Sequence, residues 1–107
     1  MKIGEACHEM ADGEILNDIL THVPLHKCTI YGDRVLSAKL SKRLSCAIKH
    51  LPIRLKFNYN SSAENAIALG ISKDPTLVLD GKIFIEGLIQ AEDITRRFEE
   101  MLCKGEG

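Results

Sequence analysis

Apolar residues recur every three or four positions along three stretches of this chain, which is the spacing of one face of an α-helix. These stretches predict helices over Ala11–Val23, Val35–His50 and Ala91–Cys103. Pro24 and Pro52 end the first two, because proline disfavours helical backbone at the residue before it. A shorter helix is expected over Ala63–Leu69, closed by Gly70.

Four other stretches have the composition or the alternation of β-strands. These strands are expected at Lys27–Tyr31, Ile53–Tyr59, Thr76–Leu79 and Lys82–Glu86. Asp80-Gly81 joins the last two as a type I′ hairpin turn, because both central positions of that turn need positive φ. A helix connects the first two strands, which makes them parallel. The predicted order, α-βα-βα-ββα, is that of an α/β protein with a mixed sheet.

A length of 107 residues predicts a single domain, with residues 1–11 as an irregular lead-in and residues 104–107 as a loose tail. No apolar run reaches 18 residues, so no membrane partner is expected. The acidic N-terminus lacks the apolar core of a signal peptide. The four cysteines form neither a C-x-x-C pair nor a zinc-ribbon pattern. These features predict a reduced, cytoplasmic protein with no cofactor and no metal ion.

Charge is unevenly distributed along the chain. Residues 27–60 hold eight Lys or Arg against one Asp, a net charge of +7, and the segments on either side each have a net charge of −4. A block this basic can steer an acidic partner, but we interpret it as a solvated helix face. It is poor in aromatic residues, so no nucleic-acid partner is expected.

The segment Gly70–Lys82 reads GISKDPTLVLDGK. It resembles the motif G-[VI]-x-x-x-P-[TA]-L-V-[LIV]-[DN]-G-K of the thioredoxin-like fold, and in particular of its small glutaredoxin-like branch. The flanking predicted elements follow in the family's order from about Asp12 to Cys103. The resemblance implies a thioredoxin-like α/β domain whose four-stranded mixed sheet has the order 2-1-3-4 in this chain's own numbering. It also implies helices on both faces of the sheet and a cis peptide bond at Asp74-Pro75.

The thioredoxin-like family places a C-x-x-C motif in the loop after its first strand, where a helix N-terminus stabilises a thiolate. Here the loop Tyr31–Ala38 contains no cysteine, and Asp33 is expected to cap the helix with its carboxylate. Dithiol activity, and any catalytic residue, are therefore not expected. We expect instead a non-catalytic binding or adaptor module for a protein or peptide. By the resemblance, its cis-proline groove lies between two loops, comprising Asp33, Arg34, Val35, Leu36 and Ser37 on one side and Asp74, Pro75 and Thr76 on the other.

Two alternatives remain open. An atypical thiol–disulfide or glutathione-linked redox protein would use Cys46 as a relocated reactive thiol, because nearby positive charge favours a thiolate. Cys46 has four basic neighbours at helical spacing: Lys42, Arg43, Lys49 and His50. The other alternative is a structural subunit of a redox or metal-handling assembly. His22, His26 and Cys28 lie close in sequence, but they match no established zinc pattern, and Cys28 is assigned to the core.

Overall fold

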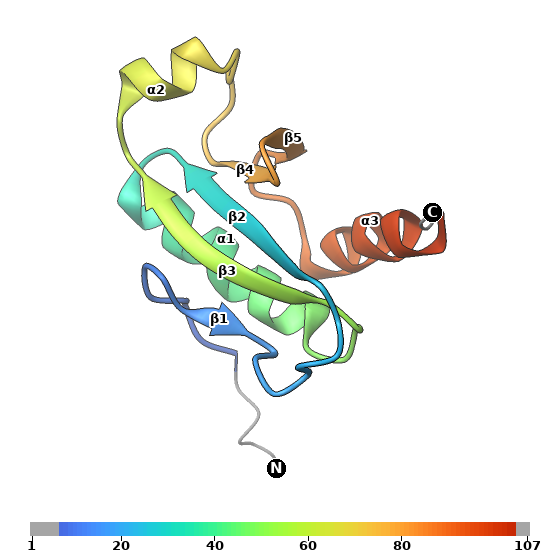
Figure 1. Ribbon diagram of the computed structural model, residues 1–107. Helices are drawn as coiled ribbons and strands as arrows, with labels where there is room; N and C mark the ends of the chain where they lie inside the picture. The colour runs from blue at the N-terminus through green and yellow to red at the C-terminus, as the bar shows by residue number, and fades with distance from the viewer. Residues whose placement is uncertain (1–6, 105–107) are drawn as a thin grey trace.

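The computed structural model describes residues 7–104, which form one five-stranded mixed sheet and three helices (Figure 1). The strands are β1 (Ile15–Leu16), β2 (Leu25–Tyr31), β3 (Arg54–Asn60), β4 (Thr76–Leu79) and β5 (Lys82–Glu86). The helices are α1 (Arg34–Ile48), α2 (Ala63–Ala68) and α3 (Ala91–Lys104). Residues 1–6 of the predicted lead-in and 105–107 of the predicted tail lie outside the described residues.

The strands lie side by side in the order β1-β3-β2-β4-β5. β2 and β3 are parallel, whereas β4 runs antiparallel to β2 and to β5. The four predicted strands are therefore confirmed in their predicted order, and β1 is added at the edge. The hairpin turn is confirmed as well, because Asp80 and Gly81 have φ angles of 51° and 86°. The Asp74-Pro75 peptide bond is cis, as predicted.

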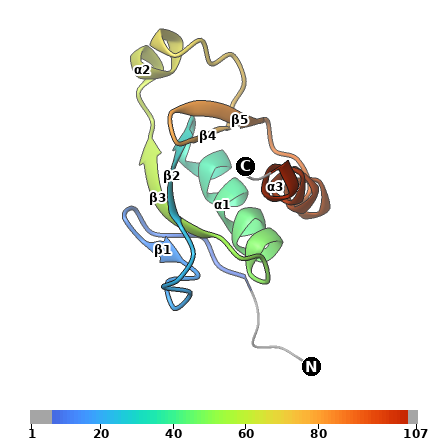
Figure 2. The same cartoon turned by 45° about the vertical axis from the view of Figure 1, so that its right-hand side comes forward.

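Helices α1 and α3 pack against each other on the same side of the sheet (Figure 2). Thr95 of α3 donates to the carbonyl of Ala47 at 2.9 Å, and Arg43 of α1 donates to the carbonyls of Leu88 and Ile89. Helix α2 lies beyond the strand ends and buries no residue. The predicted placement of helices on both faces is therefore wrong.

The core lies between the sheet and the pair α1 and α3. Alternate residues of the central strands point into it, so the alternation predicted for β3 is confirmed. The fully buried apolar strand residues are Cys28, Ile30, Leu55, Phe57, Leu77 and Ile85. Helices α1 and α3 contribute Leu40, Leu44, Ile48, Ile94 and Phe98. The opposite sheet face stays largely polar, as a sheet covered on one side can.

The predicted helix over Ala11–Val23 is wrong, and hydrogen bonds to distant residues explain why. The segment runs along the edge of β3, where Gly13 N donates to the Phe57 carbonyl at 2.6 Å and Phe57 N donates to Glu14 at 2.8 Å. Asn17 adopts a φ of 63° and donates its side-chain amide to carbonyls of the α1–β3 connection. Ile19, which the helical pattern would bury, is 88% exposed. Pairing with β3 outcompetes a local helix here.

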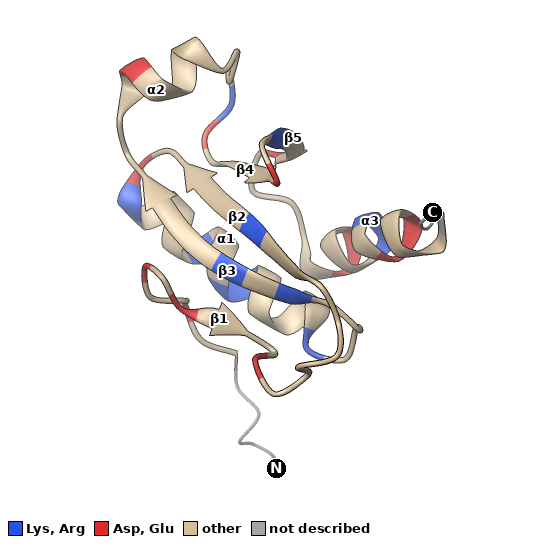
Figure 3. Cartoon of the chain, viewed as in Figure 1, with Lys and Arg blue, Asp and Glu red and all other residues tan. Residues whose placement is uncertain are grey.

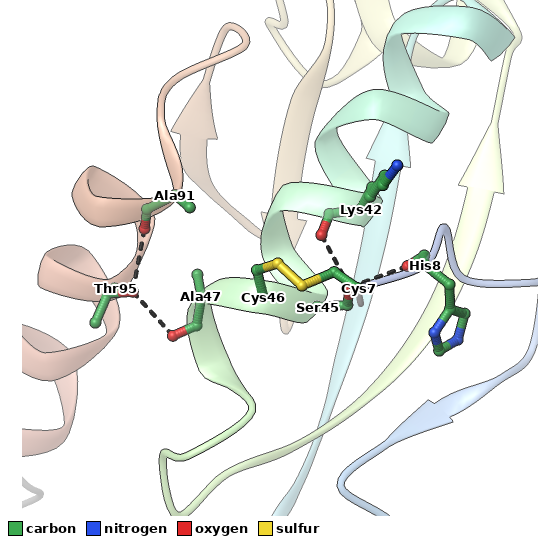
Figure 4. Close-up of a disulfide and its surroundings, with 8 residues drawn as sticks. All are labelled: Cys7, His8, Lys42, Ser45, Cys46, Ala47, Ala91 and Thr95. Carbon is green, nitrogen blue, oxygen red and sulfur yellow. Dashed lines mark hydrogen bonds between the residues drawn. A yellow bond between two sulfur atoms is a disulfide. The ribbon is translucent and has the colours of Figure 1, made fainter. Parts of the chain in front are cut away.

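A disulfide joins Cys7, in the segment before β1, to Cys46 of α1 (Figure 4). The prediction of a fully reduced chain is therefore wrong for this pair, which lies 39 residues apart in sequence. The other two cysteines are free: Cys28 is buried and Cys103 is exposed. None of the helices in residues 7–104 has both the length and the apolar character needed to cross a bilayer.

The basic block of residues 27–60 does not form one stripe. Figure 3 shows its positive residues divided between α1 and the strands β2 and β3. On the strands, Lys27 and Lys56 are direct neighbours in the parallel register. Arg54 pairs with Asp18 at 3.8 Å. The block is thus spread over more than the helix face that the charge pattern suggested.

Candidate functional site

The parallel strands β2 and β3 have their carboxyl ends on the same side of the sheet, and the loop from β2 into α1 crosses that side. We call it the carboxyl edge of the sheet. In open α/β sheets this edge is a common place for a ligand. Gly32 of the loop has a φ of 137°, and a Cβ added there would collide with the carboxylate of Asp74. A glycine is therefore required where the β2–α1 loop meets the loop before β4.

Asp33 is the N-cap of α1, as predicted. Its carboxylate accepts from the N–H groups of Val35 at 3.0 Å and Leu36 at 3.2 Å. These are two of the N–H groups that a helix leaves unsatisfied at its start. The N–H groups at the start of α1 are thus bonded to this chain's own carboxylate.

Asp74 ties the two loops together. Its carboxylate accepts from the backbone N–H of Asp33 at 3.0 Å. The next two residues are turned inward: Pro75 is buried with its carbonyl bonded to the N–H of Gly87, and Thr76 is fully buried with its hydroxyl bonded to the Lys73 carbonyl at 2.7 Å. Pro75 and Thr76 therefore support the loop, and their side chains have little surface to offer a ligand.

A groove of about 310 Å³ lies between the β2–α1 loop, α2 and the loop before β4. We call it the loop groove. Of the eight predicted groove residues, Asp33 and Asp74 line it. Sequence reasoning missed the contribution of α2 and its flanks, which supply most of the remaining lining: Ser61, Ser62, Ala63, Ala66, Ile67 and Ile71. Ile67 is 73% exposed, so α2 presents an apolar side chain to solvent at the groove.

A second, larger pocket of about 450 Å³ borders the same loop at Gly32. We call it the helix-start pocket. Arg34 and Ser37, which were predicted for the groove, line this pocket instead, together with Tyr59 and residues 9–12. Val35 and Leu36 line neither. Sequence reasoning missed residues 9–12, because Glu9 and Met10 lie in the predicted irregular lead-in and Ala11 and Asp12 were assigned to a helix. Contacts with β3 and α1 position the segment instead.

None of the described cysteines lies at the start of a helix. Cys46 is in the last turn of α1 and is bonded to Cys7, so it is not a free thiol in this structure. Burial, aided by the charge of Asp80, raises the pKa of the Cys28 thiol far above its ordinary value. Cys103, on α3, is exposed. The thiol chemistry predicted for Cys46 thus depends first on opening the disulfide.

Two carboxylates have lowered pKa values. For Glu14, the main cause is the hydrogen bond from the Ala11 N–H at 2.7 Å, with a smaller contribution from His8. For Asp80, partial burial opposes ionisation, but hydrogen bonds from His26 and the Lys27 N–H together outweigh it and lower the pKa. Partial burial raises the pKa of Tyr59. Within residues 7–104, no three His, Cys, Asp or Glu residues are arranged to hold a metal ion.

The geometry therefore offers two adjoining pockets at one sheet edge, an internally capped helix, and a disulfide on the same helix. No protein-family model, curated protein or solved structure matches this chain.

Proposed function

We propose that this chain is a thioredoxin-like, non-catalytic binding module that takes a peptide or a protein segment in the loop groove. The sheet order, with β2 central, parallel to β3 and antiparallel to β4, supports the thioredoxin-like assignment. The added strand β1 and the helices on one side only are departures from that pattern. The cap formed by Asp33 supports a non-catalytic role, because it satisfies the N–H groups that a thiolate would use.

The observation that carries the proposal is the exposed apolar surface of α2 beside the groove. α2 has no buried residue, so its side chains contribute little to the core, although Ser62 caps it and Ile71 N bonds back to the Ala66 carbonyl. Ile67 therefore stands on an ordered helix and is free to contact a partner. Apolar anchors surrounded by polar groups are typical of interface hot spots. We expect a ligand with an apolar side chain on Ile67 and polar backbone groups near Asp33 and Asp74.

A peptide library displayed on phage, selected against the oxidised protein, tests this function. Selected peptides should bind the wild type in fluorescence polarisation. Ile67→Gln should weaken them roughly tenfold, the loss expected when one apolar side chain is no longer buried. Ile19→Gln is the matched control, because Ile19 is also strongly exposed, at 88% against 73% for Ile67, but lies in the turn after β1. Equal affinity in the two variants, or no selected peptide, contradicts the proposal.

The second candidate function is the thiol chemistry predicted for Cys46, and the disulfide is the observation that favours it. In that scheme a substrate thiolate attacks one sulfur of the Cys7–Cys46 bond and forms a mixed disulfide, while the other cysteine leaves as a thiolate. A second substrate thiol then releases the oxidised substrate and completes reduction of the pair. A glutathione-like thiol would serve as substrate. Oxidation of such a thiol by one equivalent of the disulfide-bonded protein, measured against Cys46→Ser, separates this function from binding alone.

A cytoplasmic location is a proposal that the disulfide makes testable. Disulfides persist mainly in oxidising compartments and are usually transient in the cytosol. Rapid alkylation of living cells, followed by mass spectrometry, reports whether Cys7 and Cys46 are joined. A permanently oxidised pair would argue against the cytoplasm.

A further inference from the structure

The helix-start pocket carries opposite charges on two of its walls. Residues 9–12 form one wall and bring the carboxylates of Glu9 and Asp12. The start of α1 forms another and brings the guanidinium of Arg34. Neither the Glu9 side chain nor the Arg34 side chain has a hydrogen bond or an ion pair within residues 7–104. One oxygen of Asp12 accepts from Tyr59 N at 2.9 Å, and the second oxygen has no such bond to the described residues.

The wall formed by residues 9–12 is fixed to the rest of the fold, so the pocket is a built feature. The Met10 N–H donates to the Ser41 hydroxyl at 3.1 Å, and the Met10 carbonyl accepts from the Tyr59 hydroxyl. His8 directly precedes this wall in the chain, and its carbonyl accepts from the Ser45 hydroxyl at 2.9 Å beside the Cys7–Cys46 disulfide (Figure 4). The acidic wall is thus tied to both α1 and β3.

Ser37 gives an independent indication of a ligand. It lines the pocket, it is 2% exposed, and its hydroxyl has no hydrogen-bond partner among the described residues. A buried hydroxyl without a partner is rare and unfavourable, because it has lost its bonds to water. Ser37 and Arg34 are three residues apart on one face of α1, so both can reach the same group. A carboxylate would satisfy both side chains at once.

We propose that the helix-start pocket binds a small zwitterion, either a free amino acid or a short peptide. Arg34 and Ser37 hold its carboxylate, and Glu9 and Asp12 hold its ammonium group. A simple anion is disfavoured by the two carboxylates, and a simple cation leaves Arg34 and Ser37 without a partner. The volume of about 450 Å³ lies in the range of small-molecule sites and is ample for an amino acid.

Chemical-shift mapping tests the site with defined probes. The ¹⁵N-labelled, oxidised protein is titrated with each of the common amino acids and with triglycine, up to about 10 mM, which detects even millimolar affinity. At least one probe should shift the amides of Gly32, Ser37 and Tyr59. Its N-acetylated, C-amidated analogue, which lacks both charges, should not. Binding of amino acids alone, or of triglycine alone, identifies the source of the zwitterion, whereas no shift with any probe overturns the proposal.

Three variants test the assigned contacts. Arg34→Gln should weaken the active probe at least tenfold, because it removes a charged hydrogen bond to the carboxylate. Lys39→Gln is the matched control on the exposed side of α1, outside the pocket lining, and should bind like the wild type. Ser37→Ala should also weaken binding while leaving the denaturation midpoint unchanged or raised, because it removes an unsatisfied hydroxyl. Equal binding in Arg34→Gln and Lys39→Gln, or unweakened binding in Ser37→Ala, overturns the proposal.

Discussion

Replacing Cys7 and Cys46 together by serine should destabilise the fold by up to about 4 kcal/mol. The disulfide closes a loop with a sequence separation of 39 residues. In the chain-entropy description, a loop of that length removes about 13 cal/mol/K from the unfolded chain, or about 4 kcal/mol at 25 °C. For a domain of this size that corresponds to a decrease in Tm on the order of 15 °C or more.

The loss should arise mainly in the unfolded state, because other contacts still hold the segment in the folded one. Met10 remains bonded to Ser41 and Tyr59, and Ser45 remains bonded to His8. Glu14 and Gly13 remain paired with β3. The double variant should therefore keep the native far-UV circular dichroism spectrum and the native NMR shifts of β1.

Urea denaturation followed by circular dichroism measures the effect. Oxidised wild type, wild type with excess reductant, and the double variant are compared at the same pH. The reduced wild type and the double variant should have the same urea midpoint, well below that of the oxidised wild type. Cys103→Ser is the control, because Cys103 is an exposed thiol outside the disulfide, and it should match the oxidised wild type. If oxidised and reduced wild type have the same midpoint, the reasoning from loop entropy is refuted.

Three further predictions concern single groups. Iodoacetamide should label Cys103 in the oxidised native protein, and label Cys28 only on unfolding, because burial removes access and raises the pKa of that thiol. Mass spectrometry of the digested protein distinguishes the two, and fast labelling of Cys28 would contradict its place in the core. Gly81→Ala should lower the free energy of unfolding by about 1–3 kcal/mol, because alanine is strained at the positive φ of this position. Gly32→Ala should lower it by more, as measured by urea denaturation, because the added methyl group also displaces the Asp74 carboxylate that accepts from Asp33 N. Equal losses would show that the contact between the loops contributes nothing. Because the folded protein lowers the pKa of Asp80, the ionised carboxylate stabilises the fold. This stabilisation is fully present above the ordinary pKa of 3.8 and is lost as the pH falls through the lower pKa of the folded state. The Asp80→Asn variant should therefore lose less stability in acid than the wild type does. Asparagine is chosen because it tolerates positive φ and so keeps the turn. If the unfolding free energies of the two proteins change in parallel with pH, the stabilisation by the Asp80 carboxylate is ruled out.

Local chemistry in the sequence was sufficient for the central elements. The alternation in Ile53–Tyr59, the helical period of Val35–His50 and the Asp80-Gly81 turn each act within a few residues, and each element formed close to its predicted bounds. The cap by Asp33 is local as well, since it bonds N–H groups two and three residues ahead. Such features depend on backbone preferences that are the same in any fold.

Only the tertiary structure decided the conformation of residues 7–24 and the make-up of the candidate site. The segment from Ala11 has a helical pattern, yet β3 and the carbonyls around Ile48 and Ile53 offer it hydrogen bonds that a local helix could not match. That change leaves one sheet face without a helix and brings residues 9–12 against α1. The pairing of Cys7 with Cys46 follows from the same packing. Contacts between residues 30 to 50 positions apart leave no periodic trace in the sequence, because each partner is selected by its place in space and not by its neighbours along the chain.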